Sequence, residues 1–126
     1  MADERPVVLV AEDDPSVRLA LEFVLKYEGF DVVFAEDGIK ALEMARNARP
    51  DIILLDHLMP KMDGREVLGE LKGDENTSGI PVLVLTGMPE RDSENWEGAE
   101  FVGKPFTPDE LIAKINAALG ESDRSG

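Results

Sequence analysis

Carboxylates that follow two apolar segments are the residues best suited to carry chemistry in this chain. Ile52 to Leu55 is a short aliphatic run that ends on Asp56, and Val7 to Ala11 is a second such run, followed by the acids of Glu12 to Asp14. Short runs this apolar are typical of strands buried on both faces of a sheet. Two predicted core strands therefore deliver acids at their C-terminal ends, where ligands bind in open α/β sheets.

Two further polar residues follow later strands. Thr86 ends the apolar run that begins at Pro81, and Lys104 comes just after the short run Phe101-Val102. Clustered carboxylates suit an oxygen-liking cation, and Mg²⁺ is the usual one where phosphate is involved. A carboxylate is also a competent nucleophile toward phosphorus, and a lysine and a hydroxyl are suited to stabilising a transferred phosphoryl group.

These residue types predict a phosphoryl-transfer site. We assign Asp56 as the nucleophile, Asp13 and Glu12 to the metal, and Lys104 and Thr86 to the phosphoryl group. The third acid of the first cluster, Asp14, directly precedes Pro15-Ser16 and is predicted to cap a helix.

The elements that must position these residues alternate between strand and helix. We predict strands at 7–11, 31–35, 51–56, 81–86 and 101–102, and amphipathic helices at 15–28, 38–49, 65–72 and around 111–119. This alternation predicts an α/β fold: a doubly wound, flavodoxin-like parallel sheet of order 2-1-3-4-5 with helices on both faces. In that order the first and third strands are neighbours, so Glu12, Asp13 and Asp56 should meet.

Composition limits the possible classes of function. We expect residues 1–126 to form a single domain, with a core from about 7 to 120 and a polar tail at 121–126. The chain has no cysteine and no long apolar run, so we expect a cytoplasmic protein without a membrane association. We also expect a monomer. A net charge of −14 argues against direct contact with nucleic acid, because neutralising phosphates requires clustered Lys and Arg.

From Val7 to about Gly120 the chain resembles a response-regulator receiver domain. The resemblance rests on Glu12-Asp13, Asp56, Met59-Pro60, Met62-Asp63-Gly64, Thr86 and Lys104-Pro105-Phe106. It implies that Asp56 accepts a phosphoryl group from a histidine kinase or phosphotransfer protein of a two-component or phosphorelay system. It also implies signalling through contacts with a downstream protein target, and no enzymatic activity beyond the chain's own phosphotransfer and dephosphorylation.

The resemblance implies roles for further residues. Mg²⁺ would be bound by Asp13, Asp56 and the backbone carbonyl of Leu58, with Glu12 acting through water. The Lys104-Pro105 bond would be cis. Phe101 occupies the aromatic position that, together with Thr86, acts as a switch in this family.

The region between Thr86 and Lys104 departs from the family pattern. Only eighteen positions separate these two residues (104 − 86), whereas a typical receiver has several more and uses them for a full fourth helix. Residues 90–97 are polar apart from Trp96, which we interpret equally as a packing residue or as an anchor for a partner. We therefore predict a shortened fourth-helix region.

Three alternative interpretations remain open at this stage. The first is an interaction module that keeps the fold and is never phosphorylated, and the second is a receiver excised from a longer protein. A magnesium-dependent phosphatase with an aspartyl nucleophile is the third, and Leu58 argues against it because such enzymes place a second acid there.

We predict that residues 87–97 are the segment least protected from amide hydrogen exchange in the unphosphorylated protein, the chain ends aside. Few apolar groups are available there to offset a backbone ordering cost of ~1–2 kcal/mol per residue. The measurement is hydrogen exchange with and without the phosphoryl mimic beryllium trifluoride, which should move the start of the segment through Thr86. Strong protection in both states would instead show a rigid fourth helix.

Overall fold

The structure, a computed structural model, describes residues 5–56, 63–87, 96 and 98–124, with side chains up to residue 120. Strands and helices alternate in this part of the chain. The strands are β1 (Val7–Ala11), β2 (Asp31–Ala35), β3 (Ile52–Asp56), β4 (Val82–Thr86) and β5 (Glu100–Gly103), and the helices are α1 (Pro15–Tyr27), α2 (Gly38–Ala48), α3 (Gly64–Lys72) and α5 (Pro108–Arg124).

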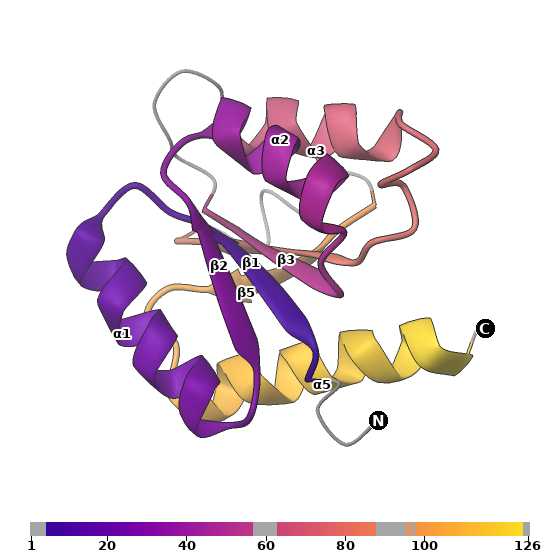
Figure 1. Cartoon of the computed structure of the whole chain (residues 1–126). Coiled ribbons are helices and arrows are strands. Elements are labelled where there is room, and N and C mark those ends of the chain that lie inside the picture. Colours follow the sequence, from indigo (N-terminus) through magenta and orange to yellow (C-terminus); the bar gives the residue numbers. More distant parts are fainter. Residues whose placement is uncertain (1–4, 57–62, 88–95, 97, 125–126) are drawn as a thin grey trace.

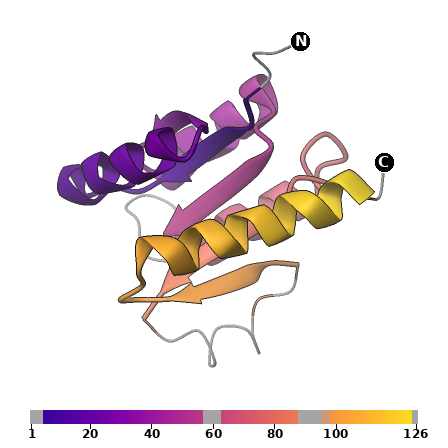
Figure 2. The same cartoon turned by 90° about the horizontal axis from the view of Figure 1, so that it is seen from below.

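The five strands form one parallel sheet of order β2-β1-β3-β4-β5, which confirms the predicted flavodoxin-like fold. Every residue of β3 and β4 is buried, as expected for central strands covered on both faces. Helices α2 and α3 lie on one face of the sheet, and α1 and α5 lie on the other (Figures 1 and 2).

Alternation along the strands divides the core into two layers. Leu9, Ile53 and Val84 pack with the apolar residues of α2 and α3, while Val10, Leu54 and Leu85 pack with those of α1 and α5. Each strand is thus locked on both faces, because a slip of one residue would exchange the two sets of side chains. This fixes where each strand ends, and therefore where the polar residues that follow it are placed.

Side-chain caps place the helix starts close to the ends of the strands. Asp14 accepts a hydrogen bond from the Ser16 N–H at 2.9 Å, which confirms its predicted role at the start of α1. Asp37 caps α2 through the Lys40 N–H at 2.8 Å, and Asp63 forms a capping box at the start of α3. Each cap stabilises the fold by about 1 kcal/mol and limits the freedom of the loop before it.

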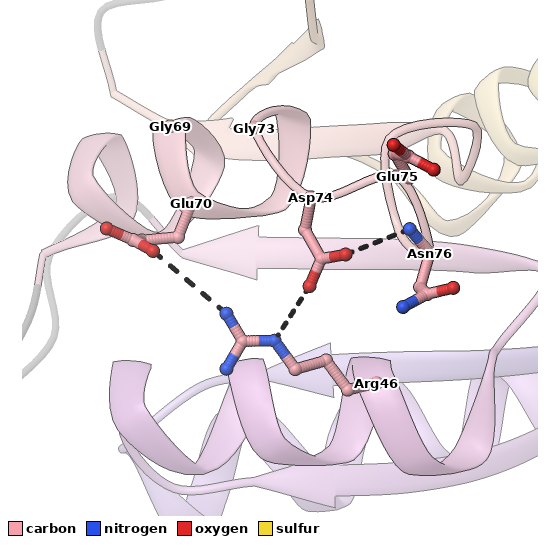
Figure 3. Close-up of a pocket in the computed structure, with 7 residues that line it drawn as sticks. All are labelled: Arg46, Gly69, Glu70, Gly73, Asp74, Glu75 and Asn76. Carbon is pink, nitrogen blue, oxygen red and sulfur yellow. Dashed lines mark hydrogen bonds and ion pairs between the residues drawn. The ribbon is translucent and has the colours of Figure 1, made fainter.

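An arginine joins the two helices on one face of the sheet. Arg46 of α2 lies 3.1 Å from Asp74 through Nε and 4.0 Å from Glu70 through Nη2 (Figure 3). The N–H of Asn76 also donates to Asp74, and these contacts lower the pKa of the Asp74 carboxyl, the backbone hydrogen bond most. Because the three side chains are partly exposed, we attribute orientation of α2 against α3 to them and little stability.

Helix α5 continues to Arg124, so the first four residues of the predicted polar tail, 121–124, are helical.

The shortened fourth-helix region remains a prediction, because residues 88–95 and 97 lie outside the described part. Trp96 itself is buried in the α2/α3 layer and contacts Phe101 edge to face, with ring centroids 6.1 Å apart. Packing is therefore the interpretation that the structure supports for Trp96.

Candidate functional site

The register between β1 and β3 places two acids side by side. Ala11 is the partner of Leu55 in the parallel ladder, so the next residues on the two strands, Glu12 and Asp56, lie next to each other. The side chains alternate in the same phase on both strands, since Val10 and Leu54 share one core layer. The prediction that the ends of the first and third strands meet is thus confirmed.

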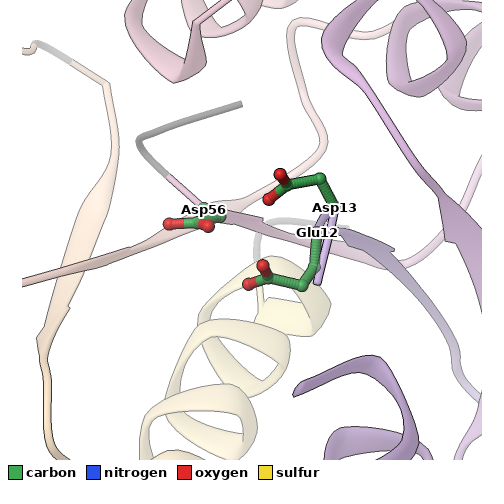
Figure 4. A group of neighbouring side chains, drawn as sticks. All are labelled: Glu12, Asp13 and Asp56. Atoms are coloured by element: carbon green, nitrogen blue, oxygen red, sulfur yellow. The ribbon is translucent and has the colours of Figure 1, made fainter. Parts of the chain in front are cut away.

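Three carboxylates gather at this point. Glu12, Asp13 and Asp56 each offer an oxygen that lies within 4.8 Å of the others (Figure 4). Glu12 and Asp56 are buried, at 2% and 6% exposure, whereas Asp13 is exposed. The cluster therefore has two buried acids at its base and one acid that faces solvent.

A lysine reaches the cluster from the edge of the sheet. Lys104 follows β5, two strands away from β3, which is about 10 Å at the spacing of a sheet. Its Nζ nevertheless lies 3.0 Å from Asp56 Oδ1, because the long lysine side chain spans the separation between the two strands. The Lys104 backbone is also held, since its N–H donates to the Thr86 carbonyl at 2.7 Å. The Lys104-Pro105 peptide bond is cis, as the family resemblance implies.

Thr86 lies at the same edge of the sheet. Its neighbour Leu85 is the ladder partner of Asp56, and the Thr86 side chain is fully buried. Phe101 is half-buried and packs against the α2/α3 layer and Trp96. Leu58, the remaining predicted site residue, lies outside the described residues.

Glu12 has the most unusual surroundings in the cluster. Its Oε2 accepts a hydrogen bond from the Asp14 N–H at 3.2 Å, while its Oε1 is buried and has no hydrogen-bond partner among the described residues. Burial, and to a lesser extent the nearby Asp56 carboxylate, raise the pKa of Glu12 to about 7. A divalent cation fits this donor set, because together with Lys104 it would balance the charge of the three acids, and it would offer Oε1 the partner that it lacks among the described residues.

The backbone of Glu12 is fixed as well as its side chain. Its N–H donates to the Ala35 carbonyl of β2 at 3.0 Å, and its carbonyl accepts from Arg18 Nη1 at 2.8 Å. Arg18 was not predicted as a site residue. The sequence feature that indicates this contact is the position of Arg18 one helical turn after the cap Asp14, because helical side chains point back toward the N-terminus.

Comparison with known proteins gives a consistent result. A family model described as the response regulator receiver domain matches residues 8–116. The chain is 37% identical to the DNA-binding dual master transcriptional regulator RpaA of a Synechocystis strain, over 94% of this chain and 51% of RpaA. It is 39% identical to the DNA-binding response regulator MtrA of Mycolicibacterium smegmatis, over 94% of this chain and 53% of MtrA. The chain therefore spans about half the length of these relatives.

Solved structures agree. The receiver domain of a sensor histidine kinase from Pseudomonas aeruginosa, solved with a magnesium ion coordinated in its active-site cleft, superimposes with a TM-score of 0.84 at 30% identity, covering 92% of this chain and 98% of that one. A receiver domain protein from Methanospirillum hungatei gives a TM-score of 0.89 at 24% identity, over 98% of this chain and all of that one, and supports the fold alone.

The raised pKa of Glu12 predicts how stability depends on pH when no metal is bound. The unfolded chain releases this proton near pH 4.5 and the folded protein near pH 7, so the folded state binds more protons between these values. Stability should therefore fall as pH rises from about 4.5 to 7, and the loss should be complete above pH 7. Glu12→Gln should remove this loss and raise the thermal unfolding midpoint at pH 8 in EDTA, with a smaller gain at pH 5.

The matched control is Glu43→Gln, which removes the same charge from an exposed side chain that pairs with Lys40. Its unfolding midpoint should follow the wild type across the pH range. Parallel curves for Glu12→Gln and wild type would contradict the environment described for Glu12.

Proposed function

Because the chain belongs to the response regulator receiver domain family, we propose that it accepts a phosphoryl group on Asp56 from a histidine kinase or phosphotransfer protein. The observation that carries this proposal is the buried Asp56 carboxylate, held 3.0 Å from Lys104 and within 4.8 Å of two further acids. Asp56 thus has Lys104 as a cationic partner and lies beside acids that could hold a second cation.

The transfer step is a displacement at phosphorus. An oxygen of Asp56 attacks the phosphoryl group of the donor's phosphohistidine and forms a new P–O bond, while the P–N bond breaks and its electron pair remains on the imidazole nitrogen. The product is an aspartyl phosphate, a mixed anhydride that stores part of the donor's transfer potential. The step needs no general base, because a carboxylate oxygen attacks with its own lone pair and loses no proton.

The neighbours of Asp56 have separate roles in this step. Lys104 would shift from Asp56 to the arriving phosphoryl oxygens and balance their charge, and Thr86 would donate its hydroxyl to one of them. Glu12 and Asp13, together with Asp56 and the Leu58 carbonyl, would hold Mg²⁺. When bound, Mg²⁺ neutralises charge on the carboxylates and on the phosphoryl oxygens.

The surface of α1 supports a protein as the phosphodonor. Leu19, Phe23 and Tyr27 are 68%, 74% and 82% exposed and recur every four residues along the helix that begins beside the acids. Large apolar side chains exposed in a row mark protein contacts more often than plain surface. A donor domain that presents its histidine to Asp56 would meet this row.

Other partners and the location follow from the family and the charge. We propose a downstream protein target and a cytoplasmic monomer. No helix in the described part of the chain is both long and apolar enough to cross a membrane.

The two relatives named above are DNA-binding regulators, so the expectation that no nucleic acid takes part is not confirmed. We keep it as a proposal for this chain alone, on the basis of its charge of −14.

The first prediction of this proposal concerns the acceptor. Incubation with acetyl phosphate and Mg²⁺ should add one phosphoryl group to the wild type, as measured by mass spectrometry of the intact protein. Asp56→Asn should abolish the addition, and Asp13→Asn should slow it by about tenfold or more, because loss of a ligand or its support weakens metal binding to that degree.

Asp63→Asn is the control, since Asp63 caps α3 and takes no part in the proposed chemistry. It should be phosphorylated like the wild type. A phosphoryl group found on His57 in the wild type would overturn the assignment of Asp56. Absence of both Mg²⁺ binding and phosphorylation would favour the alternative of an unphosphorylated interaction module.

The second prediction concerns the lifetime of the aspartyl phosphate. The family resemblance places Leu58 and Met88 on either side of the path of the hydrolytic water, and neither apolar side chain can orient it. Hydrolysis should therefore be slow, and Leu58→Asn should speed it several-fold, measured as the decay of the phosphorylated mass after the donor is removed. Leu58→Met is the matched control and should decay at the wild-type rate. An unchanged or slower rate for Leu58→Asn would contradict the argument.

A further inference from the structure

We propose that Arg18 is a positioning residue for the acidic site: it fixes the peptide group between Glu12 and Asp13 and thereby sets where both carboxylates meet a cation. The inference rests on the proposed phosphoacceptor function. It adds a residue of α1 whose guanidinium bonds the backbone that carries the acids.

The contact is well defined. Arg18 Nη1 donates to the carbonyl oxygen of Glu12 at 2.8 Å in a partly buried setting. The other backbone group of Glu12, its N–H, is bound to Ala35 of β2 at 3.0 Å. The two hydrogen bonds hold Glu12 from both sides, one through the sheet and one through the helix.

Asp13 depends on this contact more than Glu12 does. Glu12 follows directly from the β1 ladder, and its Oε2 has the Asp14 N–H as a partner. Asp13 is one residue further from the strand and is exposed. The peptide plane that leads into Asp13 begins at the carbonyl that Arg18 holds, so rotation of this plane would swing the Asp13 carboxylate away from Asp56.

Arg18 is itself held in place by the fold. Its backbone N–H donates to the Asp14 carbonyl at 3.0 Å in the first turn of α1, which Asp14 also caps. With Phe34, Glu36 and Lys40 it lines a small hollow of about 230 Å³ beside the end of β2. The side chain therefore reaches back from a capped helix to the loop between β1 and α1.

Charge and position make opposite predictions for Arg18. A guanidinium close to a cation site repels the cation, so removing its charge alone should leave Mg²⁺ affinity unchanged or raise it slightly. Removing a hydrogen bond that orients the ligands should lower the affinity, and partners of this kind change metal affinity by roughly 10–100-fold. The sign of the change therefore separates the two roles.

The experiment compares wild type, Arg18→Met, Arg18→Lys and the control Lys40→Met. Met keeps most of the length of the arginine stem and removes the donor. Lys40 lines the same hollow, but its ammonium pairs with the exposed Glu43 at 3.5 Å. Lys40→Met therefore removes an equal charge and leaves the hydrogen bond between Arg18 and the β1–α1 loop in place. Mg²⁺ affinity of the unphosphorylated proteins is measured by calorimetry, and phosphorylation by acetyl phosphate is followed across a range of Mg²⁺ concentrations.

We expect Arg18→Met to bind Mg²⁺ about tenfold more weakly. The Mg²⁺ concentration that half-saturates phosphorylation should rise by the same factor, while the rate at saturating Mg²⁺ stays close to wild type. Arg18→Lys should recover part of the affinity, since an ammonium can still donate one hydrogen bond, and Lys40→Met should match wild type. Equal or tighter Mg²⁺ binding by Arg18→Met would overturn the inference.

Stability is controlled separately. Thermal unfolding in EDTA shows whether Arg18→Met is folded at the assay temperature, and a merely structural role would lower the unfolding midpoint without raising the Mg²⁺ requirement of the folded protein. If Arg18→Met does not fold, Arg18→Lys is the deciding variant. A crystal structure of Arg18→Lys shows whether the lysine ammonium still bonds the Glu12 carbonyl. If that bond is lost, wild-type Mg²⁺ affinity would overturn the inference, and weaker affinity would support it. A wild type that binds Mg²⁺ without accepting a phosphoryl group would contradict the proposed function and leave the Arg18 comparison valid by calorimetry.

Discussion

The burial of neighbouring carboxylates is the constraint on which this structure depends. Glu12, Asp13 and Asp56 offer oxygens within 4.8 Å of one another, two of the acids are buried, and Lys104 is the cation bonded to Asp56. Burial, and to a lesser extent the neighbouring Asp56 carboxylate, raises the pKa of Glu12 to about 7, so holding this acid in the cluster as a carboxylate costs free energy. A bound cation or a proton would offset this cost, so the fold favours binding of positive charge at the site before any ligand is present.

Only a rigid frame can hold like charges this close. The frame here is the pair β1 and β3, whose side chains fill both core layers and whose register admits no slip. Burial of these apolar residues provides the stability that the acids reduce. The caps at the helix starts also limit the freedom of the loops that join the strands to the helices.

The parts of this arrangement that follow from local pattern were predictable from the sequence. Apolar runs ending on acids predicted β1 and β3, the alternation of elements predicted the sheet order, and the order brought Asp56 to Glu12. Arg18 was not predictable in the same way, because a partly buried arginine on an amphipathic helix has the same pattern as a solvated one. Trp96 was ambiguous for a related reason: its neighbours in sequence are polar, and the partner it packs on, Phe101, belongs to the next strand.

Lys104 and Arg18 illustrate the difference between charge and position in such a site. Lys104 touches a carboxylate oxygen directly and enters the balance of charge there. Arg18 donates a hydrogen bond to a backbone carbonyl, and its charge would oppose the cation that we propose for the site. A protein with 13 basic and 27 acidic residues has few cations to place, and one placed against the electrostatic preference of the site must contribute something other than charge. The hydrogen bond of Arg18 to the Glu12 carbonyl supports a positioning role, because it holds the loop that carries the acids proposed to bind the metal.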